Sequence, residues 1–134
     1  MIRSLAFALV LVSAGCASTA PPLDPAEAEA ATASVDGFRS YVRGLGHSLF
    51  PEVTFDPGLF AVNRQSFTVD SGNGALSVYA FDSEGAMEQA ATRLANRSFS
   101  LEWNVYKGGR LVVVYVGRDP GLLAGLSRVM APLP

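Results

Sequence analysis

The sequence predicts an α+β fold: a two-layer domain with helices on one face of a mostly antiparallel four-stranded sheet. Two stretches, 66–81 and 101–117, alternate apolar and polar residues around glycine-containing turns, as β-hairpins do. A helical pattern of apolar residues follows each hairpin, and a third precedes the first hairpin. These observations give the order α-ββα-ββα. The 134 residues suit a single domain.

The first helix is predicted from residue 34 onward. Gly44 and Gly46 provide a stop signal at its end. The segment 46–65 contains breakers at Pro51, Pro57 and Gly58, and we expect it to be a loop. The apolar residues at helical spacing are Val35, Phe38, Tyr41, Val42 and Leu45.

Both hairpins have an apolar face. In the first, residues 71–74 supply the turn, and the side chains that share a face are Phe67, Val69, Leu76, Val78 and Ala80. In the second, Gly108 and Gly109 form a two-residue loop that places Lys107 opposite Arg110. The side chains on its apolar face are then Leu101, Trp103, Val105, Val112, Val114 and Val116.

Each later helix begins at a capping residue. Ser83 is the expected N-cap of the helix after the first hairpin. Asp119 caps the last helix, with Pro120 in the first helical position. The apolar stripe of the earlier helix comprises Met87, Ala90, Ala91 and Leu94, and that of the last comprises Leu122, Leu123, Leu126, Val129 and Met130.

The N-terminus has the pattern of an export signal. Arg3 precedes an apolar run at 5–12, and small residues occupy 13–15. That run is too short for a transmembrane helix, which needs about 20 apolar residues. The sequence SAGC at its end resembles the lipobox of bacterial lipoproteins, with Ser13 where an aliphatic residue is usual. The resemblance implies that residues 1–15 are a signal peptide and that Cys16 is acylated, by palmitate or a similar chain, after cleavage.

Two other readings of this segment stay open. In the first, the chain is cut further on, after Ala17 or Ala20, and is secreted without an anchor. In the second, the apolar run is not cleaved and remains as the anchor. Cys16 is the single cysteine, and an unpaired thiol is a liability in an oxidising compartment, which favours acylation. The lipoprotein resemblance also implies the outer membrane where a host has two membranes, because Ala17 is not the Asp that retains lipoproteins inside.

The predicted domain boundary lies at Ser34. Residues 16–33 are rich in Ala and Pro, so we expect the lipidated cysteine and a flexible tether there. The part after Pro25 also suits a helix that continues into the next element. Residues 34–134 form the single small α+β domain.

The composition restricts the class of partner. Ten Lys and Arg stand against twelve Asp and Glu, so the chain lacks the basic balance typical of a nucleic-acid partner. One histidine, with no cysteine left after acylation, gives no usual zinc ligand set, so we expect no metal. No glycine-rich phosphate loop follows a strand and opens a helix, and we expect no cofactor.

The solvent face of the predicted sheet is the candidate binding surface. Its polar and aromatic side chains resemble those enriched at recognition surfaces, although an ordinary exposed sheet face has a similar composition. We expect attachment to the membrane through Cys16 and a second partner, which is another envelope protein, a second copy of this chain or a cell-wall glycan. The candidate residues are Tyr79, Tyr106, Tyr115, Phe81 and Asn104.

Catalysis is the alternative function. His47 is the single histidine, and Ser48, Glu52 and Asp56 follow it in the same predicted loop. A catalytic triad needs each of these groups within hydrogen-bonding reach, and adjacent His and Ser do not normally supply that. The domain also resembles small uncharacterised bacterial envelope proteins, through its Val-Tyr strand and the stretch GGRLVVVYVG, and this resemblance implies no known activity. We expect a non-catalytic protein.

Overall fold

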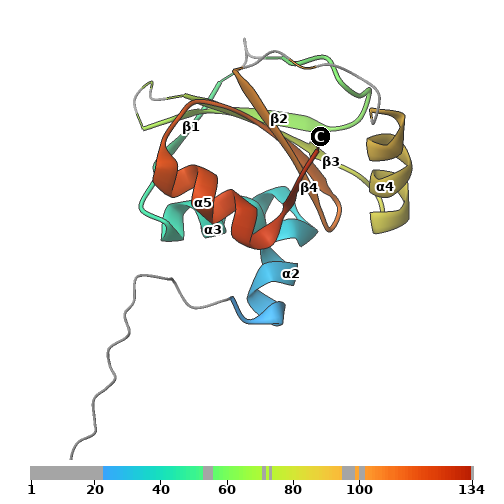
Figure 1. The fold of residues 1–134 in the computed structure, drawn as a ribbon, viewed down its shortest axis with the longest axis horizontal. Coiled ribbons are helices and arrows are strands. Elements are labelled where there is room, and N and C mark those ends of the chain that lie inside the picture. Colours follow the sequence, from blue (N-terminus) through green and yellow to red (C-terminus); the bar gives the residue numbers. More distant parts are fainter. Residues whose placement is uncertain are drawn as a thin grey trace, which may run out of the picture.

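The computed structural model describes residues 23–52, 56–70, 72, 74–94, 99 and 102–133. This part of the chain forms four helices and one open six-stranded sheet (Figure 1). The predicted signal peptide, Cys16 and the first part of the predicted tether lie outside the described residues. The helices are α2 Pro25–Ala33, α3 Val35–Gly44, α4 Glu84–Arg93 and α5 Pro120–Val129. The strands are β1 Leu49–Pro51, β2 Arg64–Val69, β3 Ala75–Ala80, β4 Trp103–Gly108, β5 Leu111–Val116 and β6 Ala131–Pro132.

The sheet has the order β1-β2-β3-β5-β4-β6, with every neighbouring pair antiparallel. The predicted α+β class and both hairpins are confirmed, but the count of four strands is wrong. Short edge strands extend the sheet on each side: β1 lies in the predicted loop, and β6 follows the last helix. Both contain a proline, which edge strands tolerate because one side of the strand needs no ladder partner.

Helices cover both faces of the sheet, which corrects the prediction of helices on one face. On one face α3 and α5 pack against the apolar side of the first hairpin, through Phe38, Val42, Leu122 and Leu126. On the other face Met87 and Ala91 of α4 pack against the apolar side of the second hairpin. Figure 1 shows α3 and α5 together and α4 apart from them. Each hairpin has the predicted face, but the two faces point to opposite sides.

The register of the second hairpin differs from the prediction by two residues. Lys107 pairs with Val112, so that the turn consists of Gly109 and Arg110. Gly109 has a φ of +54°, a conformation that favours glycine. Because side chains alternate with a period of two, a shift of two residues leaves the same side chains on the same face.

Helix α2 belongs to the domain, so the boundary at Ser34 is too late. Ala31 and Thr32 are buried, and the carbonyl of Thr32 accepts a hydrogen bond of 2.9 Å from the backbone N–H of Arg110. A Cβ at Gly109 would overlap Thr32, and one at Gly37 of α3 would overlap the carbonyl oxygen of Ala30. The last nine residues of the predicted tether are thus a helix docked on the hairpin turn and on α3.

The predicted helix starts are confirmed by their caps. Ser83 Oγ accepts a hydrogen bond of 3.0 Å from the N–H of Ala86. Asp119 Oδ2 accepts one of 2.8 Å from the N–H of Leu122, with Pro120 in the first turn. These caps satisfy N–H groups that have no partner within the helix.

Among the described residues, no helix has the length and apolar character needed to cross a membrane.

Candidate functional site

The predicted aromatic binding face does not exist as one exposed surface. Tyr79 and Tyr115 have no exposed area, and Tyr106 is 6% exposed. Tyr79 pairs with Val112 and Tyr115 pairs with Leu76, which places the two tyrosines on opposite faces of the sheet. The prediction is wrong because it assigned both hairpins the same inner face, whereas helices cover each side.

On the face of α3 and α5, the candidate residues have structural roles. Tyr106 and Tyr115 lie in the core beneath α5. The hydroxyl of Tyr115 accepts a hydrogen bond of 3.2 Å from the backbone N–H of Asp119. The side-chain amide of Asn104 donates to the carbonyls of Tyr115, at 3.2 Å, and Gly117, at 3.3 Å. These contacts hold the end of β5 and the start of α5. Tyr106 and Tyr115 are buried, and Asn104 is only partly exposed.

On the face of α4, Tyr79 and Phe81 belong to an aromatic cluster with Phe60. The ring of Phe60 meets each of them edge-on at a centroid distance of 5.2 Å, a favoured geometry for aromatic pairs. The hydroxyl of Tyr79 accepts a hydrogen bond of 3.2 Å from the backbone N–H of Leu59. Burial raises the pKa of this hydroxyl above its usual value, and the hydrogen bond from Leu59 opposes the rise. The cluster therefore fixes segment 59–62 over β3.

A groove runs between segment 59–62 and helix α4. Its volume is about 460 Å³, within the range of small-ligand sites. We call it the α4 groove; its lining comprises Leu59, Phe60, Ala61, Val62, Phe81, Ala90, Arg93 and Leu94. A second hollow of about 300 Å³ shares Val62 and Phe81 with it and extends to Asn63, Asp82 and Ala86. Together the two hollows follow α4 from its C-terminal to its N-terminal end.

The α4 groove is apolar, with one cation. Arg93 is the last residue of α4 and the single charged residue of the lining. No described residue forms an ion pair with Arg93. Val62, at the outer wall, is 39% exposed although it is a large hydrophobic residue. The groove therefore offers apolar surface and one guanidinium to a ligand.

Sequence reasoning missed this groove except for Phe81, which it placed on an open face of the sheet. The signal was present in Leu59, Phe60, Ala61 and Val62, four consecutive apolar residues in a segment predicted to be a loop. Apolar side chains in a surface loop indicate that the loop packs on the domain or offers an apolar contact surface to a partner. Segment 59–62 does the first through Phe60, which packs on β3, and Val62 remains exposed for the second.

His47 lies in a separate cluster with two aspartates. Its Nδ1 is 2.6 Å from Oδ2 of Asp70, and its Nε2 is 3.3 Å from Oδ2 of Asp119. The other oxygen of Asp70, Oδ1, accepts a hydrogen bond of 2.7 Å from the backbone N–H of Ser48. These hydrogen bonds, that of His47 first, hold the pKa of Asp70 below its usual value. The cluster joins the segment after α3, the turn after β2 and the start of α5.

The partners of His47 differ from those of the catalytic hypothesis. Glu52 lies against Thr68, and Asp56 forms an ion pair with Arg64. Both imidazole nitrogens face carboxylates, whereas a general base needs one nitrogen directed at the proton it removes. No three His, Cys, Asp or Glu side chains in the described part of the chain are arranged to hold a metal ion. The geometry suits a structural link between three segments.

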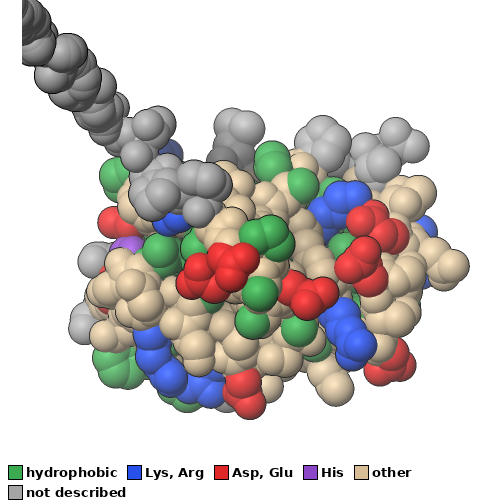
Figure 2. All heavy atoms as spheres, turned by 90° about the horizontal axis from the view of Figure 1, so that it is seen from below, with side chains coloured by type: hydrophobic (Ala, Val, Ile, Leu, Met, Phe, Trp, Pro, Cys, Tyr) green, Lys and Arg blue, Asp and Glu red, His purple; other side chains and the backbone are tan. Residues whose placement is uncertain are grey.

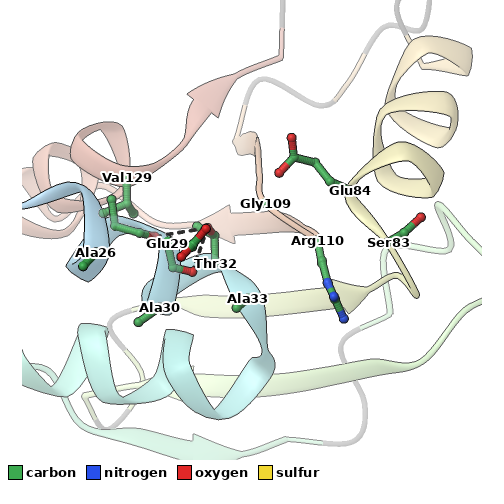
Figure 3. Close-up of a pocket in the computed structure, with 11 residues that line it drawn as sticks. Ala26, Glu29, Ala30, Thr32, Ala33, Ser83, Glu84, Gly109, Arg110 and Val129 are labelled. Carbon is green, nitrogen blue, oxygen red and sulfur yellow. Dashed lines mark hydrogen bonds between the residues drawn. The ribbon is translucent and has the colours of Figure 1, made fainter.

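A hollow of about 630 Å³ lies beside α2 (Figure 3). Its lining includes alanines of α2 and three charged residues, Glu29, Glu84 and Arg110. In Figure 3 the side chains of Glu84 and Arg110 point in different directions rather than toward a common point. Ligand sites combine apolar walls with convergent polar groups, and this hollow lacks that convergence.

The surface charge is mixed. Figure 2 shows acidic and basic side chains interspersed on the face viewed from below Figure 1. This agrees with the net charge of −2 and differs from the continuous basic face that binds nucleic acid.

Comparison with known proteins finds no matching family model, no matching curated protein and no matching solved structure.

Proposed function

We propose that this protein is a bacterial lipoprotein, anchored in the cell envelope by acyl chains on Cys16, whose domain binds a ligand or partner in the α4 groove without catalysis. The outer membrane is the proposed location where the host has two membranes. The anchor is supported by the charged start, the apolar run and the SAGC sequence of the N-terminus. Two or more acyl chains give the stable attachment that one chain does not.

The α4 groove carries the binding half of the proposal. Its walls leave Val62 exposed and expose part of Phe60 and Phe81. Exposed apolar side chains that line a hollow are typical of a binding site. The His47 cluster supports the non-catalytic half, because both ring nitrogens face carboxylates.

The anchor is tested by cell fractionation of the wild type beside Cys16→Ala. We expect the wild type in the membrane fraction and the variant in the soluble fraction, with the mass of the wild-type N-terminal peptide increased by its acyl chains. A wild type that is already soluble, or an N-terminal peptide without acyl mass, contradicts the anchor.

Binding is tested in the native envelope with a photoreactive phenylalanine analogue at Ala61, which lines the α4 groove. The matched control carries the analogue at Arg43, an exposed residue of α3. We expect one defined adduct from position 61 that position 43 does not give, and its mass identifies it as protein, glycan or lipid. The same adducts from both positions, or none from position 61, contradict a binding role for the groove.

A further inference from the structure

We propose that the α4 groove binds a long-chain fatty acid, with the aliphatic chain between segment 59–62 and α4 and the carboxylate at Arg93. This inference rests on the proposed function, because it names the ligand class of the same groove. Three features carry it: the elongated shape, the apolar lining and the placement of charge at the two ends.

The shape suits a linear ligand. Helix α4 has ten residues, which corresponds to a length of about 15 Å. The two hollows that share Val62 and Phe81 lie along this helix. The volume of about 460 Å³ for the α4 groove is toward the lower end for ligand sites, so the groove accommodates one chain more readily than the two chains of a phospholipid.

The lining favours an aliphatic chain over a peptide. Apart from Arg93, the side chains of the groove are aliphatic or aromatic. A peptide would bring backbone N–H and C=O groups into this lining, and each such group without a hydrogen-bond partner costs free energy. An aliphatic chain has no polar groups to satisfy, and its burial against Leu59, Phe60 and Leu94 is favourable.

The charges at the two ends set the direction of the ligand. Arg93, at the C-terminal end of α4, offers a guanidinium whose planar fork matches a carboxylate. Asp82, at the other end, would repel a carboxylate. The carbonyl end of a helix also disfavours an anion, so the carboxylate lies out at the guanidinium rather than against the helix terminus. The aliphatic tail then extends toward Val62 and Phe81.

The experiment uses the full acylated chain in phosphatidylcholine vesicles and two photoreactive probes, a palmitic acid and a hexadecanol with the same reactive group in the chain. After irradiation, the labelled residues are identified by mass spectrometry. The variants are Arg93→Gln, which removes the cation, and Ala61→Trp, which fills the groove. Arg43→Gln is the matched control, because it removes a cation from the exposed end of α3.

We expect the palmitic acid probe to label residues 59–62 and 90–94 of the wild type and of Arg43→Gln. Loss of one charge-assisted contact in Arg93→Gln should lower the labelling by about tenfold at low probe concentration. The hexadecanol probe should label the wild type and Arg93→Gln equally, because it has no carboxylate. Ala61→Trp should abolish labelling of the groove by either probe.

Labelling elsewhere in the chain, or palmitic acid labelling that Arg93→Gln leaves unchanged, overturns the inference. Because mapping the wild-type label needs no variant, a poorly folding variant does not remove the test. Displacement of the probe by an apolar tetrapeptide at lower concentration than by palmitate also overturns it and identifies a peptide site. If these tests fail while the analogue at Ala61 still captures an envelope component, the fatty acid is wrong and the binding function stands.

Discussion

The imidazole Nδ1 of His47 lies 2.6 Å from the carboxylate Oδ2 of Asp70, so the single histidine of the chain closes the turn after β2 against the segment after α3. Asp70 has a φ of +45°, which Asp and Asn adopt more readily than other residues with a side chain. Asp70 therefore has two roles: its carboxylate contacts His47, and its backbone adopts an unusual positive φ. A substitution can remove the carboxylate and keep a residue that tolerates this φ.

The substitution Asp70→Asn should reduce stability at neutral pH and leave it less sensitive to acid. The pKa of Asp70 is lower in the folded protein than its usual value, mainly through the hydrogen bond with His47. A carboxyl of this kind stabilises the fold fully above its unfolded pKa, about 3.9, and loses that contribution as the pH falls through the folded pKa. Asn keeps the backbone preference and removes the charge.

Urea unfolding at pH 7 and pH 3 measures this effect. The difference in unfolding free energy between wild type and Asp70→Asn should be present at pH 7 and smaller at pH 3. Asp36→Asn, at an exposed carboxylate in the first turn of α3, serves as the control for removing a surface charge. An equal difference at both pH values would mean that the contact with His47 does not depend on the charge of Asp70.

The substitution Asp119→Ala should destabilise the protein more than Ser83→Ala. Both remove a helix cap, which costs about 1 kcal/mol. Oδ2 of Asp119 also lies 3.3 Å from Nε2 of His47, so its removal affects both the cap of α5 and the contact with His47. Chemical denaturation of the two variants gives the comparison, and Asp119→Ser, which keeps the cap, should recover only part of the loss. Equal losses for the two alanine variants would show that the contact with His47 adds no stability.

The substitution Tyr79→Phe should loosen segment 59–62. It removes the acceptor of the Leu59 N–H at a cost of about 1 kcal/mol, while the ring contact with Phe60 remains. Hydrogen exchange at Leu59 and Phe60 should quicken, and unfolding free energy should fall by that amount. Tyr106→Phe is the matched control, since the described residues include no hydrogen-bond partner for its hydroxyl. Unchanged exchange at Leu59 would show that the aromatic contacts alone hold the segment.

The substitution Gly109→Ala should displace α2. The new Cβ would overlap the backbone and side chain of Thr32, and crowding of this kind costs about 1–3 kcal/mol. Gly58→Ala is the control, because Gly58 also has a positive φ, +69°, with open space around it. A melting temperature lower for Gly109→Ala than for Gly58→Ala is the expected outcome. Equal melting temperatures would mean that α2 adds little to the domain.

Local sequence signals predicted the helices and hairpins. Ser83, Asp119 and Pro120 marked helix starts because capping depends on a few neighbouring residues. Alternation defined one apolar face of each hairpin because side-chain direction has a period of two. The count of strands was wrong because β1 and β6 have three and two residues, too short for a periodic pattern.

The relation between the hairpins could not be read from either alone. Each hairpin has an apolar face, but which side of the sheet it occupies depends on the pairing of β3 with β5. One signal did indicate the answer: Leu111 to Tyr115 are five successive buried residues of β5. Such a run is typical of a strand covered on both faces. A β5 strand that is covered on both faces excludes Tyr115 from an exposed binding surface.

The pairing of β3 with β5 also determines how the chain can assemble. Each hairpin forms from neighbouring residues, but the β3–β5 ladder joins Ala75 to Val116 and Ala80 to Leu111, so it requires closure of a long intervening segment. Loop closure of this kind slows folding, since non-local contacts form after the entropy is lost. During synthesis the first hairpin leaves the ribosome with its inner edge unpaired, and an unpaired edge invites association with other chains. The edge of β3 therefore stays open to other chains until β5 has been synthesised and pairs with it.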